Sequence, residues 1–268
     1  MIKFIFLNLV LLVNVSTISS QTFSEKAYLL CKYSFKSISD TNKRERIRDE
    51  FVTLEIGKSG SYYYSINYDN YEKASEDFRK NHVGEKMAPG EGLKMIKKMG
   101  TPLIVYKNYT NNLTVCFDKI GQNYYTFEEL SPTFNWTIET DTMKILNQIC
   151  QKATCRFKGR SYEAWFAQGI NVSEGPWKFS GLPGLILKIR DLKNDYSFEA
   201  VAIEKNSVEI SHREINAKKV SKEQYLKIYQ YYLITPMMGE NIEAINPNIA
   251  AKLKGYVLPY NPIELTDN

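Results

Sequence analysis

The residue types that most often carry catalysis are sparse in this chain. Its 268 residues contain two histidines, His82 and His212. A nucleophile of the Ser-His-Asp or Cys-His kind would need one of them as its base. His82 closes a predicted helix and His212 ends a predicted strand among charged neighbours, so both positions are typical of solvated histidines. No G-x-S-x-G, H-E-x-x-H or phosphate-binding glycine motif occurs, and we expect no catalytic residue.

One carboxylate suggests a different chemistry. Glu163 lies two residues from Trp165 on a predicted strand. A carboxylate beside an aromatic ring suits a sugar or a cation, and two carboxylates at the right separation hydrolyse glycosidic bonds. A solvent-facing strand has the same residue pattern, and the separation of two carboxylates does not follow from sequence. A hydrolase with an unrecognised site therefore stays an alternative hypothesis.

Four cysteines suggest disulfide bonds. An even number of cysteines in an oxidising compartment is typical of disulfides, and three connectivities are open. We favour Cys150–Cys155, which closes a small loop, together with Cys31–Cys116, which joins distant strands. Zinc is disfavoured because the chain has no C-x-x-C pair. We expect no metal and no cofactor.

The first twenty residues resemble a secretory leader. Lys3 precedes an apolar run over residues 4–15, and a small, polar stretch follows up to Ser20. The run is shorter than the roughly 20 residues that span a bilayer. We predict a signal peptide over residues 1–20 and a single β-rich domain over residues 21–268. Because of this leader we expect an exported chain in the periplasm or outer envelope. No later run is long and apolar enough to predict a membrane span.

The charge pattern argues against nucleic acid. The formal net charge is +5, and the basic residues between Lys43 and Arg48 are interleaved with acidic ones. A nucleic-acid surface would need an uncompensated basic stripe. A solvated loop is the better interpretation of this segment.

Alternation with a period of two predicts most of the strands. The predicted fold class is mainly β, a β-rich α+β arrangement in which a curved antiparallel sheet forms a half-barrel or sandwich with about two packed helices. Short breaks between the runs favour hairpins over crossovers. The predicted buried faces are Ala27/Leu29/Cys31/Tyr33/Phe35, Val52/Leu54/Ile56, Leu113/Val115/Phe117, Phe134/Trp136/Ile138, Tyr162/Ala164/Phe166, Leu185/Leu187/Ile189 and Tyr196/Phe198/Ala200/Ala202.

Two helices interrupt the strands. Asp69 and Glu72 resemble a capping box for a helix ending near residues 82–84, and Ser221 with Gln224 predicts a second start. Tyr225, Tyr229 and Tyr232 then repeat at helical spacing, which favours a face packed on the sheet over a ligand surface. Residues 87–100, rich in Met, Gly and Lys, predict a flap or a short basic helix.

The most distinctive stretch runs from Gly175 to Ile186. Pro183 and Gly184 fit the second and third positions of a type II turn, where the third residue needs a positive φ. A strand follows from Leu185. We expect Trp177 and Phe179 to cover the open end of the core.

This stretch resembles the GLPGLI family of secreted Bacteroidota-type proteins, through Gly181–Ile186 itself. The flanking residues Cys150–Ala153, Gly159-Arg160, Ala164–Phe166 and Asn261–Leu265 resemble the family as well. One departure is Gly169-Ile170-Asn171, where family members often carry an Ile-Pro pair. The resemblance implies export and, by association, companionship with outer-membrane receptors of the TonB-dependent type. It implies no activity, because the function of the family is unknown.

Three functional hypotheses follow. The first is a non-catalytic binding or carrier module for an apolar or peptide-like ligand, since aromatic residues are abundant and catalytic motifs are missing. The second is an accessory protein of an outer-membrane receptor, and the third is the hydrolase. The residues predicted to contact a ligand or partner are Trp165, Trp177, Phe179, Tyr225, Tyr229 and Tyr232, and those predicted to form the turn are Gly181, Pro183 and Gly184.

Overall fold

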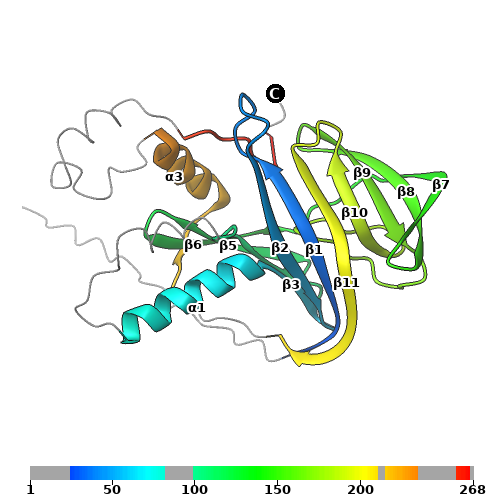
Figure 1. The fold of residues 1–268 in the computed structure, drawn as a ribbon, viewed down its shortest axis with the longest axis horizontal. Coiled ribbons are helices and arrows are strands. Elements are labelled where there is room, and N and C mark those ends of the chain that lie inside the picture. Colours follow the sequence, from blue (N-terminus) through cyan, green and yellow to red (C-terminus); the bar gives the residue numbers. More distant parts are fainter. Residues whose placement is uncertain (1–24, 82–98, 211–214, 235–257, 266–268) are drawn as a thin grey trace, which may run out of the picture.

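One large sheet organises the protein (Figure 1). A computed structural model describes residues 25–81, 99–210, 215–234 and 258–265. These residues form the strands β1 (Lys26–Ile38), β2 (Ile47–Ile56), β3 (Gly60–Ser65), β4 (Ile104–Asn108), β5 (Leu113–Ile120), β6 (Asn123–Leu130), β7 (Thr137–Ile145), β8 (Gln148–Phe157), β9 (Arg160–Ala167), β10 (Leu185–Asp191), β11 (Tyr196–Glu209) and β12 (Lys218–Lys219), and the helices α1 (Ile66–Asn81) and α3 (Lys222–Ile234). The predicted mainly β fold with about two helices is confirmed.

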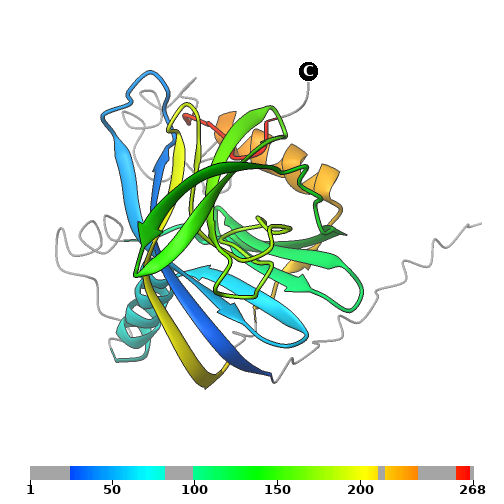
Figure 2. The same ribbon diagram turned by 90° about the vertical axis from the view of Figure 1, so that its right-hand side faces the viewer.

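The strand order is β12-β6-β5-β4-β3-β2-β1-β11-β10-β9-β8-β7. All pairs are antiparallel except β12 with β6. The strands wrap round a common interior in Figure 2, but the sheet does not close, and β7 and β12 are its two edges. Of the two alternatives that the sequence left open, a half-barrel and a sandwich, a single curled, open sheet fits the half-barrel.

The concave face carries the main hydrophobic core. Tyr33, Leu54, Phe166 and Ile189 are fully buried there, together with residues from the 168–184 loop. The predicted faces of β2, β9 and β10 all contribute to this core, as alternation requires when one face of a strand is buried. A smaller cluster, which includes Tyr62 and Tyr106, packs on the convex face.

Changes of register in the pairing of β1 with β11 interrupt the predicted faces of these two strands. The pairing of β1 with β11 shifts between Ala27 and Leu29, and again between Lys32 and Tyr33. Ala27 consequently packs in the convex cluster, whereas Leu29 packs in the main core. Ala202 lies opposite Lys32 and leaves the face of Ala200. At both shifts the extra residue lies on β11, where it disrupts the ladder locally and changes which faces of the two strands coincide.

The buried face of β5 is the opposite of the predicted one. Cys116 and Asp118 point into the core, whereas Val115 and Phe117 lie against the smaller convex cluster. The expected strand over residues 134–138 is also wrong at its start, because β7 begins at Thr137. Phe134 is nevertheless buried, where it contacts the ring of Phe179 at a centroid distance of 5.3 Å.

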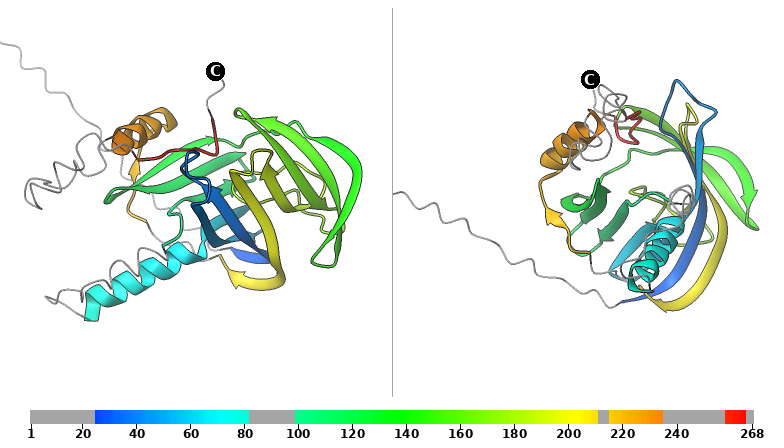
Figure 3. Two further views of the ribbon diagram at one scale, coloured as in Figure 1. Left: turned by 45° about the horizontal axis from the view of Figure 1, so that its top comes forward. Right: turned by 60° about the vertical axis from the view of Figure 1, so that its left-hand side comes forward.

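The two helices start where a side chain caps them. Ser221 and Gln224 form the predicted capping box, with hydrogen bonds of 2.9 and 3.1 Å. The first helix begins at Ile66, before the predicted Asp69, because Ser65 Oγ accepts the N–H of Tyr68 at 3.1 Å. Helix α1 packs against β2 and β3, and α3 packs against β5 and β6 (Figure 3).

The C-terminal segment 258–265 ties α3 to the far side of the sheet. Its backbone bonds to Leu233 of α3 at one end and to Lys158 at the other. The Arg160 guanidinium donates to Asp191 and Asp195 at 3.0 Å and to the carbonyl of Pro262. This buried network holds the segment, drawn in red in Figure 1, across the end of the sheet where β1 finishes.

Some predictions fall outside the described residues. They are the leader over residues 1–20, most of the 87–100 segment, and the two histidines, His82 and His212. Among the residues that are described, neither helix has the length and apolar character needed to cross a membrane.

Candidate functional site

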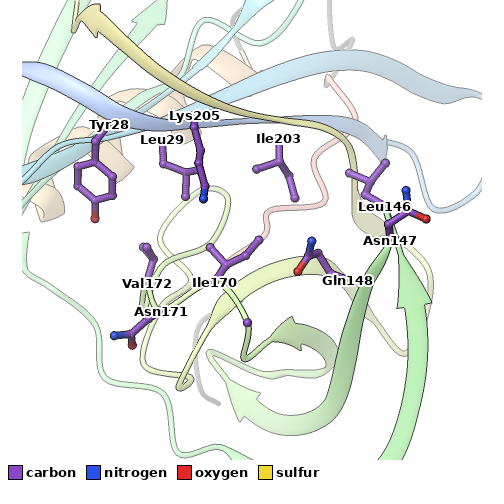
Figure 4. A pocket seen from close by; sticks show the side chains of 11 residues that line it. Tyr28, Leu29, Leu146, Asn147, Gln148, Ile170, Asn171, Val172, Ile203 and Lys205 are labelled. Atoms are coloured by element: carbon purple, nitrogen blue, oxygen red, sulfur yellow. The ribbon is translucent and has the colours of Figure 1, made fainter.

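A pocket of about 690 Å³ lies at the end of the curled sheet where β1 begins (Figure 4). That volume is within the range of about 300–1,000 Å³ typical of ligand sites. Its floor belongs to the main core through Leu29, Ile170, Val172 and Ile203. The lining residues are Tyr28, Leu29, Leu146, Asn147, Gln148, Gly169, Ile170, Asn171, Val172, Ile203 and Lys205.

One wall comes from the β1–β11 pair. Leu29 lies opposite Lys205, and Cys31 lies opposite Ile203. Directly opposed residues of an antiparallel pair share a face, so Lys205 and Ile203 both belong to the concave side. Tyr28 sits at the register shift between Ala27 and Leu29, and it is turned toward the cavity in Figure 4. In a regular strand the consecutive residues Tyr28 and Leu29 would point to opposite faces. The irregularity therefore lets both side chains line the pocket.

The opposite rim is the two-residue turn between β7 and β8. Leu146 and Asn147 have φ values of 47° and 64°, which is typical of a type I′ hairpin. Asparagine tolerates this left-handed conformation, but for leucine it costs about 1–2 kcal/mol. Leu146 is 39% exposed at the mouth of the pocket, so its position is strained without gaining full burial.

The third wall is the 168–184 loop, which a buried lysine holds in place. Lys107 forms an ion pair with Glu174 and donates to the carbonyl of Phe179 at 3.1 Å. Ser61 also donates to Glu174, at 3.2 Å. Both partners of the ion pair are buried, and removing either partner of such a pair strongly destabilises a protein because it leaves a buried charge without compensation. Lys107 thus fixes the backbone that presents Ile170 and Val172 to the cavity.

The turn that ends this loop differs from the predicted one. The N–H of Gly184 donates to the carbonyl of Leu182 at 2.8 Å, while the N–H of Leu185 donates to Ile170. The bend is therefore a three-residue γ-turn centred on Pro183 and lacks the i→i+3 bond of a type II turn. The positive φ predicted for Gly184 is present, at 156°. A Cβ there would lie 2.4 Å from the carbonyl oxygen of Ala167.

The chemistry of the lining is that of binding. Five aliphatic side chains and three amides line it, and Tyr28, Lys205 and Gly169 complete the set. No carboxylate, thiol or imidazole lines the cavity, and the described residues contain no cluster of groups that could hold a metal ion. Such a surface desolvates an apolar body and pairs with polar groups of a ligand.

Two carboxylates stand close to the pocket without lining it. Burial, followed by the charges of Glu174 and Glu25, raises the pKa of Tyr28, which keeps its phenol protonated. Burial also works to raise the pKa of Glu25, but hydrogen bonds from Ser59 and Lys58 outweigh it and hold that pKa below its usual value. Each carboxylate is thus already engaged, Glu174 with Lys107 and Glu25 with Ser59.

The structure does not bring the six predicted contact residues into the pocket. Trp177 and Phe179 are buried in the core with a ring separation of 5.0 Å, so neither is available to a partner. Trp177 also adopts a φ of 54°, a left-handed conformation for a bulky residue. Both rings fill the interior of the curl, consistent with a structural role for this part of the motif.

The tyrosine stripe of α3 packs on the sheet. Tyr225 lies 4.7 Å from the ring of Phe127 and donates to Asp118 at 2.5 Å. Tyr229 contacts Tyr260 of the C-terminal segment, and Tyr232 lies near Gly121. The packed face is therefore the better interpretation of these residues, as the sequence favoured.

Trp165 and Glu163 belong to a ladder of ion pairs on β9. Glu163 accepts from Arg190 at 3.2 Å and from the Trp165 indole at 3.4 Å, and Lys152 lies 3.8 Å away. Lys152 also pairs with Glu139 at 2.9 Å. These carboxylates are occupied by cations on a partly solvated face, an arrangement typical of a structural network and unlike that of a catalytic pair.

The four cysteines are free and buried. Cys150 and Cys155 lie five residues apart on β8, or about 16 Å at the rise of a strand. A disulfide needs Cα atoms within about 7 Å, so the Cys150–Cys155 pairing is wrong for this strand. Cys31 and Cys116 lie on β1 and β5, with three strands between them in the sheet, and burial raises the pKa of each thiol to about 12.

Comparison with known proteins gives a partial match. Residues 156–188 match a family described as protein of unknown function (Porph_ging). This is a Bacteroidota-associated family, and the matched range contains Gly181–Ile186. No curated protein matches the sequence.

Two solved structures of PNGF-II are similar in fold. The structure in space group P21 has a TM-score of 0.51 and 14% identity, covering 76% of this chain and 33% of the other. The structure in space group C2 has a TM-score of 0.49 and 15% identity, covering 75% and 32%. The chain therefore spans about a third of the length of PNGF-II, and the similarity to the structure in space group P21 shows a shared fold alone.

Proposed function

We propose that this protein is a non-catalytic binding module whose site is the pocket between β1, β11, the β7–β8 turn and the 168–184 loop. The observation that carries the proposal is the lining itself, in which aliphatic and amide side chains, with Tyr28 and Lys205, surround about 690 Å³ without a carboxylate, thiol or imidazole. An apolar, peptide-like ligand suits this surface. Its side chains would meet Leu29, Ile170 and Ile203, and its peptide groups would meet the amides.

The cellular setting is part of the proposal. The leader over residues 1–20 and the resemblance to the GLPGLI family favour export to the periplasm or outer envelope. The match of residues 156–188 to a Bacteroidota-associated family is consistent with a Bacteroidota-type protein. A chain in this compartment meets peptides and receptor segments, which fits a carrier or holding role.

Native mass spectrometry of the protein purified from the envelope of its host tests the proposal. The natural chain should retain a ligand that Asn171→Trp loses, because the indole would fill the cavity from an exposed lining position. Ser173→Trp is the matched control, since residue 173 is exposed on the same loop but does not line the pocket. Recovery of no ligand, or retention by Asn171→Trp, would contradict the proposal.

A second candidate function is an accessory role at an outer-membrane receptor. The exposed apolar side chains of β7 and β8 favour it, namely Ile138, Met143 and Ile149, of which Ile149 is 75% exposed. Strand β7 is also a sheet edge, which can pair with a strand of another protein. Co-purification of an envelope protein with the natural chain but not with Ile149→Lys would support this role.

A further inference from the structure

Lys205 is the one charged residue of the pocket lining. Its register opposite Leu29 places it on the concave face, and Figure 4 shows its ammonium directed into the cavity. Among the described residues it has no ion-pair partner. Its neighbours in the sheet differ, since Lys32 pairs with Glu204 at 3.0 Å and Lys188 with Glu199 at 2.9 Å.

The nearby carboxylates do not neutralise this charge. Glu174 pairs with the buried Lys107, and Glu25 accepts backbone and hydroxyl hydrogens of Ser59. Because each is engaged by its own donors, the pocket keeps one positive charge over an apolar floor. Lys205 is exposed and so free to meet an incoming anion, and a ligand that covers the apolar floor displaces water and thereby strengthens their attraction.

The amides indicate what carries the anion. Asn147, Gln148 and Asn171 line the same cavity, and an alkyl chain would cover them without offering hydrogen bonds. Desolvated amides without partners are unfavourable, whereas a peptide backbone supplies both donors and acceptors. A fatty acid shares the carboxylate and the apolar body but leaves these groups unpaired.

We propose that the pocket recognises the C-terminal end of an apolar peptide, with the terminal carboxylate at Lys205. The proposal rests on the proposed binding function and specifies its ligand. Tyr28 stands beside the same cavity as a protonated donor, and the amides pair with the last peptide groups. Leu29, Ile170 and Ile203 receive the apolar side chains.

Titration calorimetry on the purified full-length chain tests this. The probes are N-acetylated tetrapeptides of Ala, Val and Leu with a free C-terminal carboxylate, the same peptides as C-terminal amides, and laurate. We expect the acid to bind about tenfold more tightly than the amide, with a preference that falls as salt is raised. Lys205→Met, which keeps the apolar stem, should remove this preference, whereas Lys188→Met should retain it.

The outcomes separate the two proposals. Equal affinity for acid and amide peptides would overturn the carboxylate assignment and leave the binding function standing. Tighter binding of laurate than of either peptide would overturn the peptide assignment. An unchanged acid preference in Lys205→Met would remove Lys205 from the site. Binding of none of the probes would count against both the ligand class and the binding function.

Discussion

Replacing Asp118 by asparagine isolates the cost of burying one charge beneath α3. Asp118 accepts from the Tyr225 hydroxyl at 2.5 Å and from the Lys119 N–H at 2.8 Å. Burial nevertheless dominates and raises its pKa from 3.8 to about 6. A rise of about two units, each worth about 1.4 kcal/mol, places the cost of the ionised carboxylate near 3 kcal/mol.

The sign of the pH dependence follows from the direction of this shift. Because the folded state binds the proton more tightly than the unfolded state, the cost is absent below pH 3.8 and complete above pH 6. Asp118→Asn should therefore unfold with a free energy about 1–3 kcal/mol higher than the natural chain at pH 7.5. The gain should shrink to about half at pH 5.

Urea denaturation at the two pH values, followed by circular dichroism, measures both quantities. Asp195→Asn is the matched control. Burial works to raise the pKa of Asp195, but hydrogen bonds from Arg160, Asn261 and Arg44 outweigh it and hold that pKa below the usual value. Its replacement should destabilise at pH 7.5, with an effect that fades in acid. The reasoning fails if Asp118→Asn is no more stable than the natural chain at pH 7.5, or if its advantage does not change with pH.

Three further substitutions test the turn, the rim and the C-terminal network. Gly184→Val should lower the free energy of unfolding by about 3 kcal/mol or more, because its Cβ would lie 2.4 Å from the carbonyl oxygen of Ala167. Gly169→Ala is the control: its Cβ would meet no atom closer than 3.4 Å, so the change should be almost neutral in thermal melting. Leu146→Asn should raise the free energy of unfolding by about 1 kcal/mol, because asparagine tolerates the left-handed conformation better than leucine. The same change should weaken binding of the acid tetrapeptide about fivefold in calorimetry, because it removes the leucine side chain, 39% exposed, that the peptide would cover. Arg160→Met should cost about 3–5 kcal/mol in urea denaturation, because it removes the arginine paired with the buried Asp191 and one of the two arginines, Arg160 and Arg44, paired with Asp195. A smaller loss than that of Lys36→Met, an exposed control, would refute the role of the network.

Alternation in the sequence was sufficient to predict the sheet but not its irregularities. The faces of β2, β9 and β10 were correct because each strand keeps one side buried along its length. Ala27 was misplaced, since a change of register is a property of two paired strands and leaves no mark on either one alone. In β5 both faces are covered, so hydropathy could not distinguish the core side that carries Cys116 from the side that carries Phe117.

The pocket was not predictable from any single stretch. Four separate segments form it, and two of its features are backbone conformations: the irregularity at Tyr28 and the left-handed Leu146. The aromatic residues singled out from the sequence are conspicuous because they pack, as Trp177 and Phe179 do. One signal did point here, since the departure at residues 169–171 from the pattern of the resembled family coincides with three lining positions.

Binding of an apolar ligand in the pocket underlies both the proposed function and the proposed role of Lys205. Methyl NMR of the isoleucine-labelled chain during titration with the acid tetrapeptide tests this most directly. The account predicts that the methyl signals of Ile170 and Ile203, which line the pocket, shift together with a common affinity, while those of Ile189 in the central core and Ile228 on α3 stay in place. Shifts confined to Ile228, or none at any isoleucine while the peptide binds, would contradict it.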